Sequence, residues 1–130
     1  MTTWRVELTE PAEQELDAAF LSRGRVTSPE EALRWYAGLK NAILQIGEGP
    51  RRSARVEPAD YGYRDDPSLE LRRMRYGQGR GAWHVVYQVI DPGPNLPKND
   101  DDKNEGVVRV LHIVSAVRLP RGQTQPGETD

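Results

Sequence analysis

Residues 69–91 contain two stretches with the composition of β-strands, and a glycine-rich turn joins them. In the second stretch, Trp83, Val85, Tyr87 and Val89 alternate with a second set of side chains. A period of two in β-branched and aromatic residues predicts a strand with two unlike faces. We therefore expect a β-hairpin in which the set that begins at Trp83 faces the core, while the alternate set lies on an open face.

Several basic residues lie in and around this hairpin. They are Arg72, Arg73, Arg75, Arg80 and His84. Alternation places Arg73 and Arg75 on one side of the first strand, and a β-bulge near Arg72 and Arg73 is expected because the pattern there is irregular. A guanidinium group binds phosphate or carboxylate through parallel hydrogen bonds, so the hairpin is the predicted functional surface. A genome rich in G and C would also produce a bias towards arginine.

Two amphipathic helices are expected before the hairpin. After a strand at residues 4–8, Thr9 caps a first helix that ends near residues 22–24, and Ser28 caps a second that runs to Ile46. The short link between them predicts an antiparallel helical hairpin. Four acidic side chains are expected on the outer face of the first helix, namely Glu10, Glu13, Glu15 and Asp17.

The remaining segments are one apolar strand and three polar stretches. Residues 50–68 show no clear period and are expected to wrap an edge of the domain, and residues 55–57 are compatible with a short strand. Residues 91–106 have the composition of a flexible loop, and residues 107–114 that of a central strand. Residues 120–130 are polar and are expected to form a disordered tail.

The order of these elements is β-α-α-β-β-β, which predicts an α+β fold. We expect one domain over residues 1–119, with residues 91–106 as a loop insertion. In this domain a helical hairpin packs on one face of a mainly antiparallel four-stranded sheet. The other face of the sheet is left for function.

Composition excludes several classes of protein. The chain has no cysteine, so it has neither disulfides nor thiolate metal sites. The run Asp100–Asp102 lacks the spacing of a calcium loop, and we expect neither a metal nor another cofactor. A net charge of −2 argues against general nucleic-acid binding. Without an apolar signal core or membrane span, we expect a cytoplasmic protein with no membrane partner.

Several ordered segments carry a resemblance to a known family. They are WRVELTEPAEQELDAAF, SPEEALRWYAGLKNAILQIGEGP, LRRMRYG, WHVVYQVID and VVRVLHIVSAVR. Together these segments resemble the opening strand, the helical hairpin, the paired central strands and the last strand of the RelE/ParE superfamily. This superfamily comprises toxins of type II toxin–antitoxin systems. The resemblance covers residues 4–118 and lies in the ordered set, since no single motif is diagnostic.

The resemblance implies a growth-inhibiting toxin that a cognate antitoxin binds and neutralises, with one of two activities. RelE-like members cleave mRNA in the ribosomal A site without a metal. ParE-like members, which include plasmid stabilisation proteins, share the fold and poison DNA gyrase. The expected target is therefore gyrase or ribosome-bound mRNA, and a degenerate binding module without toxicity is a third reading. The chain would be an enzyme only under the RelE-like reading, as a metal-independent, ribosome-dependent mRNA endoribonuclease.

The resemblance also implies roles for individual residues if the chain is a RelE-like nuclease. Arg75 would stabilise the transition state, and His84 would act as acid or base. Arg118, at the basic position after the last strand, would hold an adjacent phosphate. The residues expected to bind phosphate or the target are Arg72, Arg73 and Arg80.

Departures from the nuclease pattern favour the ParE-like branch. His84 stands where the family pattern usually has arginine, and Leu71 stands where a RelE-like nuclease has lysine. The end of the sequence lacks the His-Tyr pair of another nuclease branch. The acidic overall charge also fits poorly with a ribosome-binding enzyme.

Overall fold

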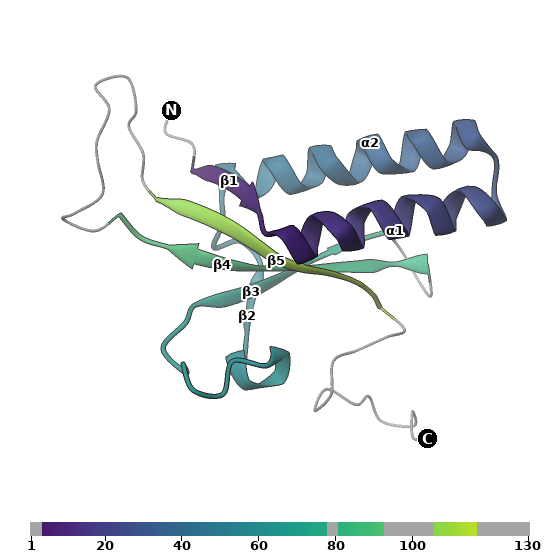
Figure 1. Cartoon of the computed structure of the whole chain (residues 1–130). Coiled ribbons are helices and arrows are strands. Elements are labelled where there is room, and N and C mark those ends of the chain that lie inside the picture. The colour runs from purple at the N-terminus through teal and green to yellow at the C-terminus, as the bar shows by residue number, and fades with distance from the viewer. Residues whose placement is uncertain (1–3, 78–80, 93–105, 117–130) are drawn as a thin grey trace.

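The computed structural model of the protein describes residues 4–77, 81–92 and 106–116 (Figure 1). Its elements are β1 (Arg5–Leu8), α1 (Glu10–Val26), α2 (Pro29–Gln45), the 3₁₀ helix η1 (Ile46–Glu48), β2 (Ala54–Val56), the 3₁₀ helix η2 (Pro58–Tyr61), β3 (Leu71–Tyr76), β4 (Trp83–Ile90) and β5 (Val107–Ser115). Most of the expected loop insertion and the expected tail lie outside the described residues.

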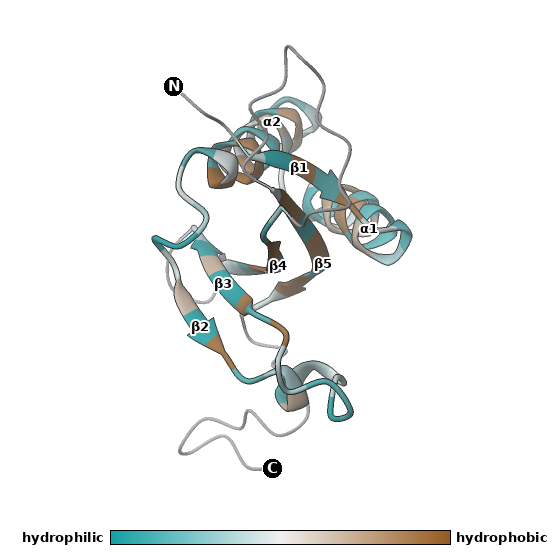
Figure 2. Cartoon of the chain, turned by 90° about the vertical axis from the view of Figure 1, so that its left-hand side faces the viewer, coloured by the Kyte–Doolittle hydropathy of each residue, from teal (hydrophilic) through white to brown (hydrophobic). Residues whose placement is uncertain are grey.

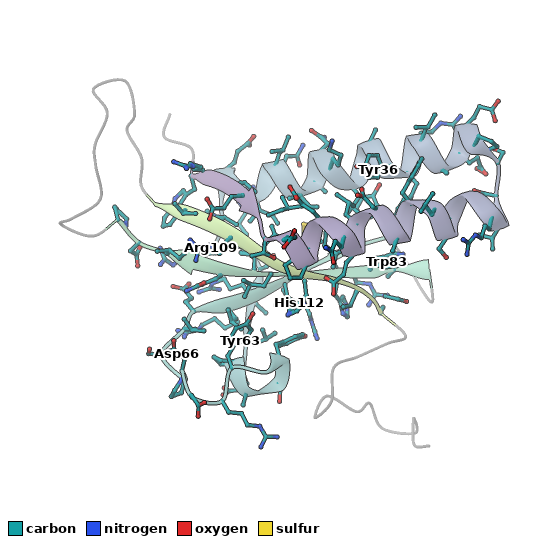
Figure 3. The ribbon with its side chains drawn as sticks, viewed as in Figure 1. Tyr36, Tyr63, Asp66, Trp83, Arg109 and His112 are labelled. Carbon is teal, nitrogen blue, oxygen red and sulfur yellow. The ribbon has the colours of Figure 1, made fainter. Side chains whose placement is uncertain are left out.

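The sheet has five strands in the order β1-β5-β4-β3-β2. Its β1 strand runs parallel to β5, and the other neighbouring strands are antiparallel. The expectation of four strands was wrong, because Ala54–Val56 pairs with β3 as an additional edge strand. At the other edge Glu7 lies opposite Arg109 (labelled in Figure 3), and an ion pair of 2.9 Å joins their side chains.

The helical hairpin is confirmed, and it covers one face of the sheet (Figure 1). Thr9 accepts a hydrogen bond from the backbone N–H of Ala12, and Ser28 accepts one from the backbone N–H of Glu31. Each cap satisfies an N–H group that the first turn of a helix leaves without a partner. The first helix extends to Val26, beyond its expected end.

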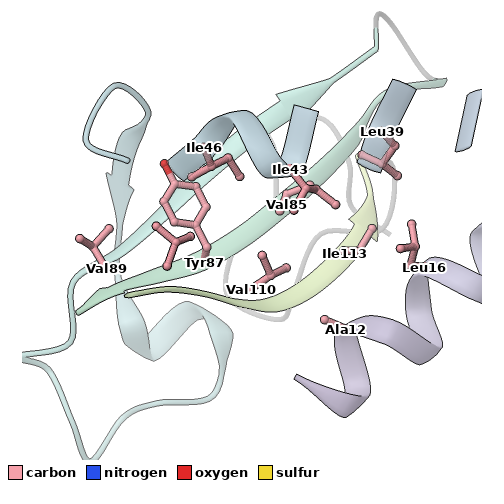
Figure 4. Packing of buried hydrophobic residues seen from close by; sticks show 11 residues of the cluster. Ala12, Leu16, Leu39, Ile43, Ile46, Val85, Tyr87, Val89, Val110 and Ile113 are labelled. Atoms are coloured by element: carbon pink, nitrogen blue, oxygen red, sulfur yellow. The ribbon is translucent and has the colours of Figure 1, made fainter. Parts of the chain in front are cut away.

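The main core lies between the two helices and the sheet (Figure 4). Leu39 and Ile43 of α2 pack against Val85 and Tyr87 of β4, and all four side chains are buried. The Tyr87 hydroxyl donates a hydrogen bond of 2.7 Å to the carbonyl of Pro50, so its buried polar atom has a partner. The expected orientation of the set that begins at Trp83 is therefore confirmed.

The opposite face of the sheet is partly covered, which corrects the expectation of an open face. Part of the 50–68 segment does lie at an edge of the sheet, as strand β2, whereas residues 57–69 lie against this face (Figures 1 and 2). The residues of the second apolar cluster are Tyr61, Leu71, Val86 and Leu111, with Val56, Tyr63 and Leu69 packed against them. Val86 of the alternate set of β4 is buried in this second cluster, and His84 of the same set is also buried.

The β-bulge expected near Arg72 and Arg73 is absent from the pairing of β3 with β4, and the irregularity lies between β4 and β5 instead. The register between β3 and β4 runs without interruption from Leu71 to Tyr76. The shift in register occurs between Val86 and Tyr87, where β4 pairs with β5. The side chains of β3 thus alternate regularly, and Arg73 and Arg75 share one face.

Glu15 connects α1 with the edge of β5. Pairing between β1 and β5 stops at Val110, so the next residues of β5 have no neighbouring β1 residue. The Oε1 atom of Glu15 accepts a hydrogen bond of 2.8 Å from the backbone N–H of Ile113. The carboxylate takes the place of a strand carbonyl, so the expectation that Glu15 lies on the outer helical face was wrong.

Candidate functional site

Two arginines and one histidine of the predicted set lie together on the face opposite the helices. In the register of the sheet, Arg75 is directly opposite His84, and Arg73 is directly opposite Val86. Directly opposed residues point to the same face, so the three basic side chains are neighbours. The Arg75 side chain is exposed, and Arg73 is partly buried. We call Arg73, Arg75 and His84 the basic face.

His84 is the buried member of the basic face, with 6% of its surface exposed. Its Nδ1 atom is buried, and no group of the described chain forms a hydrogen bond with it. Burial lowers the pKa of His84 to about 4, and the positive charges of Arg73 and Arg75 act in the same direction. The imidazole is therefore neutral at pH 7.

Tyr61 joins this site through its hydroxyl, which accepts a hydrogen bond of 3.1 Å from Nη1 of Arg73. It is the last residue of η2, and 12 positions separate it from Arg73 along the chain. Sequence reasoning missed Tyr61, because residues 50–68 show no periodicity that would place any of their side chains. Its position depends on how that segment crosses the sheet.

Arg72 lies on the other side of β3 and takes part in a structural network. It is opposite Tyr87, its Nε atom lies 2.7 Å from Oε2 of Glu70, and its Nη1 atom donates a 2.7 Å hydrogen bond to the carbonyl of Ser53. Arg51 also forms an ion pair with Glu70, in which Nη2 of Arg51 lies 2.8 Å from Oε1 of Glu70. The hydrogen bond from Arg51 is the main cause that lowers the pKa of Glu70 to about 2.

The structure does not bring Arg72 together with Arg73 and Arg75. Its side chain is 15% exposed and anchors the start of β3 to the segment before β2. Arg80 and Arg118 lie outside the described residues, so their place relative to the basic face stays a prediction. The basic face is therefore smaller than the predicted set.

Acid should weaken folding through His84. Its pKa is about 4 in the folded protein, below the ordinary value of 6.5, so the unfolded chain binds a proton first as the pH falls. Stability is greatest above pH 6.5 and is lost towards pH 4, by about 3 kcal/mol at most. In urea titrations from pH 7.5 to pH 4, His84→Leu should lose less stability than the wild type. Parallel pH profiles of the two proteins would contradict this assignment.

A second histidine lies near the edge of this face. Nδ1 of His112 lies 3.5 Å from Oε2 of Glu15, and its side chain is 31% exposed. Figure 3 shows His112 and Tyr63 on the side of the sheet away from the helices. The carboxylate of Glu15 thus contacts both the backbone of β5 and the His112 ring, which indicates a role in holding α1 against β5.

A groove of about 500 Å³ lies between α1 and the end of β5. Ala18, Ala19 and Ser22 form the helical wall, while Trp83 and Ile113 line the sheet side. The described residues contain no group of three or more His, Cys, Asp or Glu side chains placed to hold a metal ion. None of the described helices combines the length and apolar character needed to span a bilayer.

Comparison with known structures places this fold beside that of a toxin–antitoxin protein. The chain is similar to a chain of the chromosomal ParDE TA system from P. aeruginosa, with a TM-score of 0.55 and 13% sequence identity. The likeness covers 87% of this chain and 96% of that chain. No protein-family model and no curated protein matches the sequence.

This likeness shows a ParE-like α+β fold, in agreement with the resemblance in the sequence. The match extends over nearly the whole of the other chain, so it includes both the helical hairpin and the sheet. At this level of identity the fold is what the two chains share, and function has to be argued from the site.

Proposed function

We propose that the protein is the toxin of a type II toxin–antitoxin system, that it is bound and neutralised by a cognate antitoxin, and that it acts on DNA gyrase. The observation that carries the proposal is the match to a chain of a ParDE system along almost its entire length. The basic face supplies a surface for an acidic or phosphate-bearing target. Gyrase is a cytoplasmic enzyme, so the proposal places the toxin in the cytoplasm.

The state of His84 supports a target-binding role for the basic face over a catalytic one. A general acid must be protonated and a general base must be a sufficiently strong base near the working pH. With a pKa of about 4, His84 is neutral at pH 7 and is a weak base. Leu71, at the position where a RelE-like nuclease has lysine, is fully buried and has no polar group.

The arginines nevertheless retain the chemistry that a ribosome-dependent nuclease would use. Arg73 and Arg75 share a face and are separated by one residue, as expected for two groups that bind neighbouring phosphates. This arrangement makes metal-independent mRNA cleavage the second candidate function. A non-toxic binding module would keep the same face and bind only its partner.

Induced expression in a bacterium should stop growth if the protein is a toxin. Translating extracts that contain the purified protein should show intact mRNA by primer extension, because the proposed target is gyrase. Cleavage at ribosomal A sites would instead establish the RelE-like reading. Normal growth, with the folded protein present in the cells, would contradict the toxin assignment and favour a binding module.

A further inference from the structure

The segment that covers the basic side of the sheet has few backbone ties to it. Within the described residues, every backbone hydrogen bond that residues 57–69 form outside regular strands joins two residues of that same segment, and none joins the segment to the sheet. These hydrogen bonds run from Asp60 to Glu57, from Gly62 to Ala59, from Tyr63 to Pro58, from Asp66 to Tyr63 and from Leu69 to Asp66. The ladder of β2, β3 and β4 is complete without this segment.

Side chains supply the contact between residues 57–69 and the sheet. Tyr61, Tyr63 and Leu69 pack on an apolar patch formed by Leu71, Val86 and Leu111. The Tyr61 hydroxyl adds the hydrogen bond from Arg73. This cluster is separate from the main core, which lies on the other face of the sheet between β4 and the helices.

We propose that residues 57–69 form a strap that opens as a unit while the helices and the sheet remain folded. Segments held by few apolar contacts and by local hydrogen bonds open with smaller free energies than the whole protein. Opening uncovers the apolar patch immediately beside Arg73, since Val86 is the cross-strand partner of that residue. The strap therefore controls whether the face presents basic groups alone or basic groups joined to an apolar patch.

The link between strap opening and target binding rests on the proposed function, whereas opening itself does not. A partner that contacts the closed face meets the basic side chains of Arg73 and Arg75. A partner that contacts the open face also meets the side chains of Leu71 and Val86, both fully buried in the closed state. The opening equilibrium would then reduce or raise affinity according to which state the partner binds.

Two adjacent valines provide a matched test. Val85 and Val86 are both fully buried, but Val85 belongs to the main core and Val86 lies under the strap. The chain has no cysteine, so Val85→Cys and Val86→Cys each introduce a single thiol of small apolar character. The rate at which a thiol reagent labels each variant under native conditions measures how often that position opens.

The proposal predicts that Val86→Cys reacts about 100-fold or more faster than Val85→Cys. Urea below the unfolding transition should accelerate Val85→Cys strongly and Val86→Cys little, because strap opening exposes less surface than global unfolding. Equal labelling rates with the same urea dependence would overturn the proposal. This result would leave the toxin assignment untouched, since the measurement involves no target.

Hydrogen exchange of the wild-type protein keeps the proposal testable if either cysteine variant fails to fold. The hydrogen-bonded amides of Tyr63, Asp66 and Leu69 should exchange much faster than those of β4. Leu39→Ala, which weakens the main core, should accelerate β4 and leave the strap amides unchanged. Protection of the strap equal to that of β4 in the wild type would refute an independent opening.

Discussion

Replacing Arg73 and Arg75 together by glutamate should abolish growth inhibition while leaving the helices and the sheet folded. Both side chains lie on the proposed target-binding face, and Arg75 is exposed. A hydrogen bond to a charged group contributes about 1.5–3 kcal/mol, so losing two such contacts should weaken target binding about 10²–10⁴-fold. The measurement compares growth after induction with the affinity of the purified proteins for the target.

A matched control separates the position of the charges from their number. Arg25 and Arg34 are exposed on the helical hairpin, away from the sheet. Arg25→Glu with Arg34→Glu changes the net charge by the same amount, from −2 to −6, because each of two substitutions removes a positive and adds a negative charge. Growth arrest should persist in this control. Equal loss of toxicity in both double variants would contradict a specific role for the basic face.

Leu39→Ala should lower the free energy of unfolding by about 2–5 kcal/mol. Leu39 has no exposed surface and packs in the main core (Figure 4), so truncation removes apolar contacts and leaves a cavity. A small domain has a total stability of about 5–15 kcal/mol, so this loss is a large fraction of the total and should lower the melting temperature clearly. Urea unfolding followed by circular dichroism gives the difference.

Leu33→Ala is the matched control for this core substitution. Leu33 lies on the same helix, and 57% of its surface is exposed. The same chemical change should alter the free energy of unfolding by less than about 0.5 kcal/mol. A similar loss in both variants would mean that the helix does not pack on the sheet through the Leu39 side.

Local patterns in the sequence predicted the elements that local chemistry determines. Thr9 and Ser28 were identified as helix caps because their side chains satisfy the first N–H groups of each helix. The alternation from Trp83 to Val89 predicted which side of β4 faces the helices. These features depend on residues within a few positions of one another, so a single sequence contains the information.

Features that depend on distant segments were not predicted. The carboxylate of Glu15 contacts Ile113 across 98 residues of sequence, and an acidic residue on an amphipathic helix gave no signal of that contact. A short strand was expected at residues 55–57, but its pairing with β3 as a fifth strand was not, because the three residues of β2 are too short to show a period. The local pattern placed His84 on an open face and gave no signal of its burial, and its low pKa follows from that burial.

For the candidate site, the sequence predicted where the basic face lies better than it predicted which residues belong to it. Arg73, Arg75 and His84 were expected near one another and are neighbours on one face. Arg72 belongs to the other side, where its guanidinium group is paired with Glu70. Tyr61 was absent from the predicted set, because its contact with Arg73 forms only when residues 57–69 cross the sheet.

DNA supercoiling by purified gyrase tests the central claim most directly. The wild-type protein should inhibit supercoiling of relaxed plasmid or trap cleaved DNA, and the variant with Arg73→Glu and Arg75→Glu should do neither. The Arg25→Glu and Arg34→Glu variant should inhibit like the wild type. Supercoiling that proceeds unchanged with an excess of folded wild-type protein would contradict the proposed action on gyrase.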